Sequence, residues 1–166
     1  GKYRNRALIP FRDRNREPAG FVAVDYLGRE EWAKQHARDR AAAGSADSFD
    51  MLYRFFLGKY RKALYAPGFA SRRHLYGFYE EPELLKYPPS GLVLVEGERD
   101  VLKLMQEGIP CVGVHGACIK AEQRLLLKES GVLPRLKKLF LGFDMDEAGN
   151  AATQAAERWI RIGSSC

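Results

Sequence analysis

The sequence has 166 residues, 46% of them apolar and 29% charged, so it can bury a core without disulfide or metal support. No apolar run approaches the ~20 residues of a membrane span. We also expect no secretory signal, and three cysteines suit a reducing compartment, which together predict a cytoplasmic protein. Residues 1–90 hold 17 Lys/Arg and 11 Asp/Glu, whereas residues 91–166 hold ten of each, so the net charge of +6 lies in the first half. This segregated charge indicates a polyanionic partner such as nucleic acid, with a merely solvated basic face as the alternative.

The first half of the chain has an irregular pattern. Residues 8–13 and 20–24 are predicted to form two short strands around a polar turn, as in a hairpin. Residues 29–50 are polar and alanine-rich and are predicted to form a helix followed by a loop, with the break at Gly44 and Ser45.

A basic and aromatic stretch follows between Asp50 and Glu80, where no acidic residue occurs. Bases interleaved with aromatic side chains are typical of sequence-tolerant binding to single-stranded nucleic acid. The alternative is a solvated basic face over a small subdomain core. A linker is expected at Pro82, Pro88 and Pro89, so residues 1–88 are predicted to form a small basic α+β subdomain.

The second half alternates strands and helices. The predicted strands are residues 92–95, 111–114 and 138–143, and the predicted helices are residues 98–107, 119–130 and 147–162. Short connections of this kind give right-handed crossovers and a parallel sheet. Residues 89–166 are therefore predicted to form a Rossmann-like α/β domain.

Acidic residues follow two of these strands. Glu96 closes the first strand and Asp100 lies one turn into the next helix, while Asp144 and Asp146 close the third strand. Ligands of parallel α/β sheets collect at the carboxyl ends of the strands, so the four carboxylates are expected at one edge. Hard oxygen ligands of this kind suit Mg²⁺ or Mn²⁺ that shares its coordination with substrate phosphates.

The alternative interpretation is that these acids only stabilise helix N-termini. It suffices for Glu98 and Glu147, which begin helices, but does not explain Glu96 and Asp144 at the ends of apolar strands. The pattern therefore favours a metal site.

The two acidic motifs resemble a known domain. Leu94-Val95-Glu96-Gly97 with Asp100, followed at a distance by Phe143-Asp144-Met145-Asp146-Glu147-Ala148-Gly149, is similar to the TOPRIM domain of primases, topoisomerases and some nucleases. Ile9-Pro10-Phe11-Arg12-Asp13, Gly20-Phe21 and Leu75-Tyr76-Gly77-Phe78-Tyr79-Glu80 resemble signatures of the DnaG-type primase catalytic core. The resemblance runs from about residue 8 to 162, with an insertion within residues 29–58.

The resemblance implies Mg²⁺- or Mn²⁺-dependent, template-directed synthesis of RNA primers from nucleoside triphosphates on single-stranded DNA. Asp144 and Asp146 match the metal-binding pair, Glu96 matches the catalytic acid as metal ligand or proton acceptor, and Asp100 matches an accessory carboxylate. Gly97 would leave room for an approaching phosphate. The candidates for nucleic-acid or nucleotide binding are Arg12, Lys59, Tyr60, Lys62, Arg72 and Arg73. The "KY" position of the family falls on Lys59-Tyr60 in one register and on Lys62 in another.

The sequence departs from the DnaG-type family in its possible zinc ligands and in its domains. Cys111, His115 and Cys118 offer three ligands, whereas structural zinc sites are four-coordinate, so no zinc site is expected and Cys111 is interpreted as a small buried residue. The family also has a zinc-binding domain, a helicase-binding domain and an acidic residue beyond the third helix, none of which this sequence shows. We therefore expect either that the domain at residues 89–166 is truncated at its C-terminal end or that its metal site is incomplete. A replicative helicase is the partner that the family implies. A TOPRIM nuclease and a non-catalytic nucleic-acid-binding primase remnant remain alternatives.

Overall fold

The computed structural model describes residues 3, 6–81, 83–86, 91–116, 118–144 and 146–163. The chain forms two compact units, Gly1–Pro10 with Ala19–Phe69, and Phe11–Pro18 with Ala70–Cys166. The expected linker prolines lie outside the described residues, and the domain boundary at residue 88 stays a prediction. Among the described residues, no helix has both the length and the apolar character needed to cross a bilayer.

The first unit is built on a three-stranded sheet in the order β1-β2-β3. The predicted hairpin is β1 (Arg6–Arg12) with β2 (Pro18–Asp25), and its tip belongs to the second unit. The sequence did not predict β3 (Ala63–Tyr65), which pairs antiparallel with β2 so that Val22 lies opposite Tyr65. Asp25 donates its backbone N–H to the carbonyl of Lys62 at 2.9 Å, so the chain leaves and re-enters this sheet at one point.

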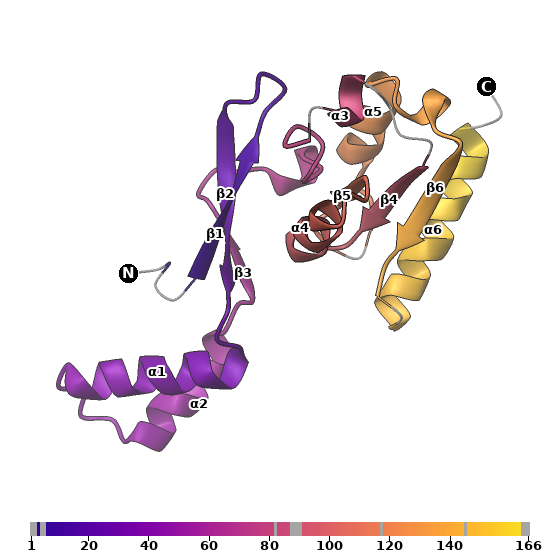
Figure 1. Cartoon of the computed structure of the whole chain (residues 1–166). Coiled ribbons are helices and arrows are strands. Elements are labelled where there is room, and N and C mark those ends of the chain that lie inside the picture. Colours follow the sequence, from indigo (N-terminus) through magenta and orange to yellow (C-terminus); the bar gives the residue numbers. More distant parts are fainter. Residues whose placement is uncertain are drawn as a thin grey trace. The chain divides into compact units, whose positions relative to one another are not determined.

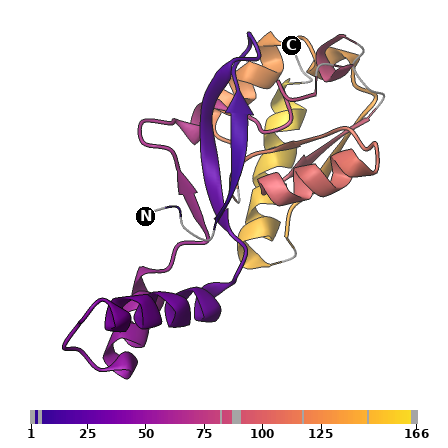
Figure 2. The same cartoon turned by 60° about the vertical axis from the view of Figure 1, so that its left-hand side comes forward.

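Two helices fill the segment between β2 and β3: α1 (Arg29–Ala42) and α2 (Phe49–Lys59). The predicted break is confirmed, since Gly44 has φ +85° and Ser48 caps α2 by accepting from the Met51 N–H at 3.3 Å. The two helices pack against each other in Figures 1 and 2, with Trp32 of α1 edge-on to Phe56 of α2 at 6.1 Å between ring centroids.

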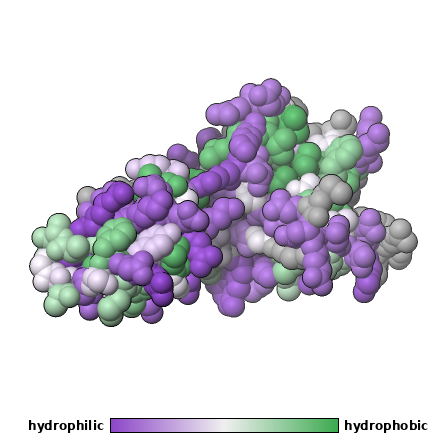
Figure 3. All heavy atoms as spheres, turned by 90° about the horizontal axis from the view of Figure 1, so that it is seen from below, coloured by the Kyte–Doolittle hydropathy of each residue, from purple (hydrophilic) through white to green (hydrophobic). Residues whose placement is uncertain are grey.

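The helical hairpin also exposes apolar side chains. Phe49, Met51 and Phe55 are all exposed although they lie on a helix that packs on its neighbour. On the left of Figure 3, where α1 and α2 lie, green apolar atoms interrupt the purple polar surface.

The second unit contains the predicted parallel sheet, in the order β5-β4-β6. Its strands are β4 (Gly91–Val95), β5 (Cys111–Gly113) and β6 (Lys138–Gly142), and its helices are α3 (Glu83–Lys86), α4 (Glu98–Gln106), α5 (Ala121–Glu129) and α6 (Glu147–Gly163), with short 3₁₀ turns η1 (Ser71–Arg73) and η2 (Leu133–Arg135). The α/β fold with a Rossmann-like parallel sheet is confirmed, because each strand from β4 onward is followed by a helix.

The core of this unit explains why the strands are so apolar. Leu92 and Leu94 of β4 are fully buried, as are Val112 and Leu127, because the central strand is covered on both faces. The core also takes up Leu75, Tyr76 and Phe78 from the segment before α3. Tyr76 forms paired backbone hydrogen bonds with Gly113, which adds this segment to the edge of β5.

Candidate functional site

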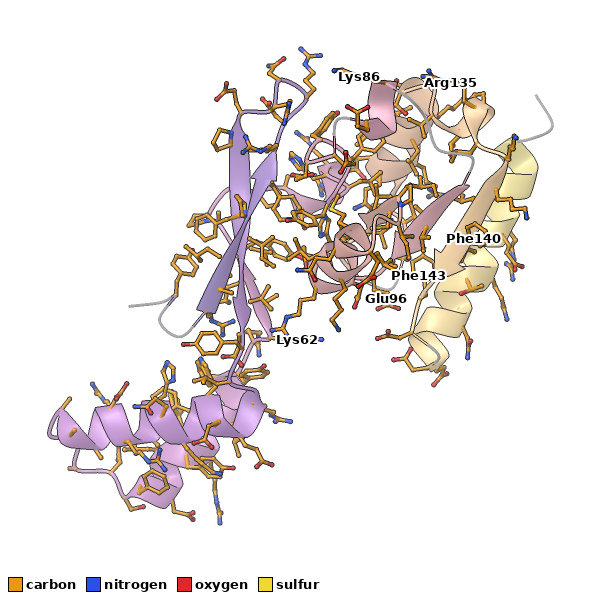
Figure 4. The ribbon with its side chains drawn as sticks, viewed as in Figure 1. Lys62, Lys86, Glu96, Arg135, Phe140 and Phe143 are labelled. Carbon is orange, nitrogen blue, oxygen red and sulfur yellow. The ribbon has the colours of Figure 1, made fainter. Side chains whose placement is uncertain are left out.

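The ends of the central strand and of β6 lie side by side. Val95 pairs with Gly142 in the parallel register, so Glu96 and Asp144 follow neighbouring strands at the same edge. The Glu96 carboxylate accepts a hydrogen bond from the backbone N–H of Asp144, with 3.2 Å between Oε1 and N. Figure 4 shows Glu96 and Phe143 at these two strand ends. The structure thus joins the two acidic motifs at Glu96 and Asp144, whereas the gathering of all four carboxylates and the roles of the acids stay predictions.

The backbone of Glu96 is held from the other side as well. Its carbonyl accepts from the Gly116 N–H at 3.1 Å, and the carbonyl of Val95 accepts from the Val114 N–H at 3.0 Å. The residue after the central strand is therefore fixed by the loops that follow both neighbouring strands.

Asp146 directly precedes helix α6 and caps it. Its Oδ1 accepts from the Gly149 N–H at 2.8 Å, and its carbonyl accepts from the Asn150 N–H at 2.9 Å. Both Asp144 and Asp146 are exposed, so their remaining carboxylate oxygens face solvent. One oxygen of Asp146 thus serves the first turn of the helix, where a negative charge is favourable.

Asp100 lies in the first turn of α4 and is exposed. Its Oδ2 is 3.3 Å from the position that a Cβ atom on Gly97 would occupy. Gly97 has φ −126°, an extended conformation open to any residue, so the space beside Asp100 is the constraint that the structure shows at this glycine.

These carboxylates suit a hard divalent cation by their chemistry. In the part of the chain that the structure describes, no three Asp, Glu, His or Cys side chains lie close enough together to hold a metal ion. Two observations support a divalent cation at these carboxylates. Carboxylate oxygens from two adjacent strand ends are ligands of the kind that Mg²⁺ prefers, and Glu96 contacts the backbone of Asp144.

Sequence reasoning missed a buried pair beside this edge. Glu98 was interpreted only as a helix-start residue, but its Oε1 lies 2.7 Å from Nδ1 of His115, and the side chains are 9% and 0% exposed, respectively. The signal available was topological: Glu98 and His115 follow adjacent parallel strands by three and two residues. The missing information was the left-handed conformation of His115, φ 59°.

Three ionisable groups of the same unit have shifted pKa values. Burial, then the charges of Glu80 and Glu98, raises the pKa of Tyr76 to about 12. Burial, then His115, lowers the pKa of His74. Burial alone raises the pKa of the Cys111 thiol to about 11, which confirms Cys111 as a small buried residue.

The cationic candidates fall in both units. Lys59, Tyr60 and Lys62 belong to the first unit, while Arg12, Arg72 and Arg73 belong to the second. All except Tyr60 are exposed. The structure does not choose between Lys59 and Lys62 for the family's "KY" position.

Several of these candidates already contact the protein. Lys59 Nζ lies 5.6 Å from the centre of the Phe55 ring, and the Tyr60 hydroxyl donates to Asp25 Oδ2 at 3.2 Å. Arg72 Nε lies 3.2 Å from Glu122 Oε1. The Arg12 guanidinium donates to the carbonyl of Arg16 at 2.6 Å, while the Arg12 backbone N–H donates to Glu80.

Comparison with known proteins gives a consistent result. The family model described as Toprim-like matches residues 93–165. A DNA primase of Chlamydia pneumoniae is 34% identical over 111 residues, 66% of this chain and 17% of that protein. The E. coli primase catalytic core has a TM-score of 0.58 at 25% identity, covering 92% of this chain and 38% of that one. A structure described as the DnaG primase catalytic domain bound to ssDNA gives the same values.

The chain therefore spans 17% of the curated primase and 38% of each of these solved chains. The matched segment runs from within β4 to α6 and contains all four acidic candidates, Glu96, Asp100, Asp144 and Asp146. Residues 93–165 match the Toprim-like family model, and the chain is similar in sequence and fold to part of the catalytic core of DnaG-type DNA primases.

Proposed function

We propose that this chain is part of the catalytic core of a DNA primase. Such an enzyme uses Mg²⁺ or Mn²⁺ to synthesise short RNA primers from nucleoside triphosphates on single-stranded DNA. The observation that carries the proposal is the contact between Glu96 and the Asp144 backbone, because it joins the two acidic motifs at one edge of the sheet. Similarity to DNA primases supports the same reaction class, nucleotidyl transfer.

In this reaction the 3′-hydroxyl of the primer forms a bond to the α-phosphorus of the incoming nucleotide, and pyrophosphate leaves. Asp144 and Asp146, together with Glu96, would hold the cation, and Asp100 would add a carboxylate nearby. Bound Mg²⁺ would neutralise the charge of the transferring group and keep the attacking and leaving oxygens in line. Glu96, the half-buried one of the candidates, would accept the hydroxyl proton where it is not itself a ligand.

Template binding is assigned to the exposed cations Arg12, Lys59, Lys62, Arg72 and Arg73, with Tyr60 as an aromatic neighbour. A related catalytic domain is described as bound to ssDNA, which supports single-stranded DNA as the template. Cations that neutralise backbone phosphates make binding strongly salt-dependent. A replicative helicase partner and a cytoplasmic location belong to the same proposal.

The test is a gel assay on the chain with labelled single-stranded DNA, all four labelled nucleoside triphosphates and Mg²⁺ or Mn²⁺. Glu96→Gln removes the charge at the strand end, and Glu129→Gln is the matched control on the exposed face of α5. New short RNA made by the wild type and the control but lost in Glu96→Gln is the expected result.

Other outcomes point to the alternatives. Shortened DNA without new RNA would overturn the primase proposal in favour of a nuclease. Retention of the DNA in a gel shift, with neither RNA nor cleavage in the longest available form of the protein, would favour a non-catalytic binding module.

A further inference from the structure

A buried acid–base pair joins the loop after β5 to the first turn of α4. Glu98 Oε1 lies 2.7 Å from His115 Nδ1, and the His115 side chain is completely buried. Phe11, itself 1% exposed, covers the imidazole with 4.9 Å between the ring centroids. The imidazole is thus shielded from solvent by a side chain near the end of β1.

The loop that this pair fixes is the one that contacts Glu96. Gly116, the residue after His115, donates its N–H to the Glu96 carbonyl at 3.1 Å. One residue before His115, the Val114 carbonyl accepts from the buried amide of Gln123 at 2.9 Å. His115 therefore sits between two anchored residues, one of which holds the backbone of the candidate catalytic acid.

The backbone conformation at His115 indicates that the position is imposed. Its φ of 59° lies in the left-handed region, which a residue other than glycine keeps only where its surroundings hold it there. The hydrogen bond to Glu98 and the contact with Phe11 supply that restraint.

We propose that Glu98 and His115 are positioning residues for Glu96: their contact keeps Gly116 bonded to the Glu96 backbone and so fixes where the Glu96 carboxylate meets Asp144. The proposal rests on the proposed function for its catalytic consequence, while its structural part stands on the contacts alone. Glu98 begins the helix that follows Glu96, so the pair restrains the acid from both its neighbouring segments.

The variants are chosen to separate positioning from general stability. Glu98→Ala removes the contact, whereas Glu98→Gln keeps an oxygen that can accept from His115 and should rescue. His115→Asn tolerates the left-handed backbone but is too short to reach Glu98. Val132→Ala, in the fully buried core of the same unit, is the control for a loss of stability unrelated to the pair.

The first readout is hydrogen exchange of individual backbone amides in the folded chain. The Gly116 and Asp144 amides, which bond to the carbonyl and the carboxylate of Glu96, should exchange at least tenfold faster in Glu98→Ala and His115→Asn. Glu98→Gln should stay near wild type. Unchanged exchange in Glu98→Ala, or equal acceleration in Val132→Ala, would overturn the proposal.

The second readout is primer synthesis. We expect kcat to fall at least tenfold in Glu98→Ala with KM for nucleoside triphosphates unchanged, and Glu98→Gln to recover most of it. A fall of the same size in Val132→Ala would overturn the positioning role. An inactive wild type would count against the proposed function, and the exchange rates would still decide whether the pair positions Glu96.

Discussion

Gly149 lies so close to Asp144 that a Cβ atom on Gly149 would overlap the Asp144 carbonyl oxygen. The same glycine donates its N–H to Asp146 Oδ1 at 2.8 Å. The first turn of α6 is therefore folded directly against the strand-end loop that carries both aspartates, and this packing requires a residue without a side chain.

Gly149→Ala should destabilise the second unit and displace Asp144, because the new methyl group overlaps backbone rather than a flexible side chain. Overpacking of this kind costs about 1–3 kcal/mol in the free energy of unfolding. The control is Gly58→Ala in α2, where nothing lies within 4 Å of the new Cβ and the helix should gain roughly 0.5–1 kcal/mol. Urea unfolding of both variants measures the difference, and equal stabilities would contradict the close approach.

Divalent cations should stabilise the folded chain if the acids at the strand ends bind them. At 100 times the dissociation constant, binding adds about 2.7 kcal/mol, which raises Tm by roughly 5 °C or more for a chain of this length. Asp144→Asn should abolish the shift caused by Mg²⁺ or Mn²⁺, while Glu129→Gln should retain it. Differential scanning fluorimetry with and without each ion is the measurement, and an equal shift in both variants would place binding elsewhere.

Arg6 should be essential for the stability of the first unit. Its guanidinium is buried and donates to the carbonyls of Ala23, Arg61 and Lys62, with the shortest contact 2.6 Å. Arg6→Met leaves these carbonyls without that donor and should cost about 3 kcal/mol.

Trp32 fluorescence in a Trp159→Phe background reports on this unit during urea unfolding, because Trp32 lies in α1. Arg40→Met, at an exposed position in the last turn of the same helix, should change stability by less than about 0.5 kcal/mol. A small effect at Arg6 would mean that water replaces the guanidinium.

The two cysteines that the structure describes should differ sharply in reactivity. Cys111 is buried with a thiol pKa raised to about 11, whereas Cys118 is exposed. The thiolate is the reactive form, so Cys118 should react with a disulfide reagent at pH 8 and Cys111 only after unfolding. Absorbance titration in a Cys166→Ser background counts the thiols, and two fast thiols in the native protein would contradict the packing.

Alkaline pH should destabilise the second unit through Tyr76. Its pKa rises from 10.0 to about 12 on folding because burial disfavours the phenolate. The contribution is therefore fully present below pH 10 and is lost between pH 10 and about 12, where the unfolded chain ionises first. The loss is about 3 kcal/mol, and Tyr76→Phe should flatten this part of the stability–pH curve. An unchanged slope in that variant would assign the effect to another group, such as Cys111.

Much of the second unit could be predicted from the sequence because its elements have clear periods and stops. The run Leu92–Val95 is apolar throughout, as a strand covered on both faces must be, and Gly108 and Gly131 end helical patterns with φ +70° and +69°. Parallel topology alone then brings Glu96 to Asp144. This part of the site follows from strand order, without any knowledge of side-chain packing.

The rest depended on contacts that no local pattern encodes. β3 has three residues and becomes a strand by pairing with β2, and most of α2 lies in the basic and aromatic stretch, for which the sequence predicted no secondary structure. The pairing of Glu98 with His115 requires a left-handed backbone at a residue other than glycine. Propensity gives no reason to expect that conformation.

The hydrogen bond from the Asp25 N–H to the carbonyl of Lys62 brings together the two ends of the segment that contains α1 and α2. Because these two ends already meet, the segment between β2 and β3 can change in length without changing the geometry of either strand. Residues 26–61 are thus a natural position for transplanting a foreign loop, a fluorescent reporter or an affinity handle into this scaffold. We expect such a graft to leave the register between β2 and β3 in place, because the paired residues lie outside the replaced segment.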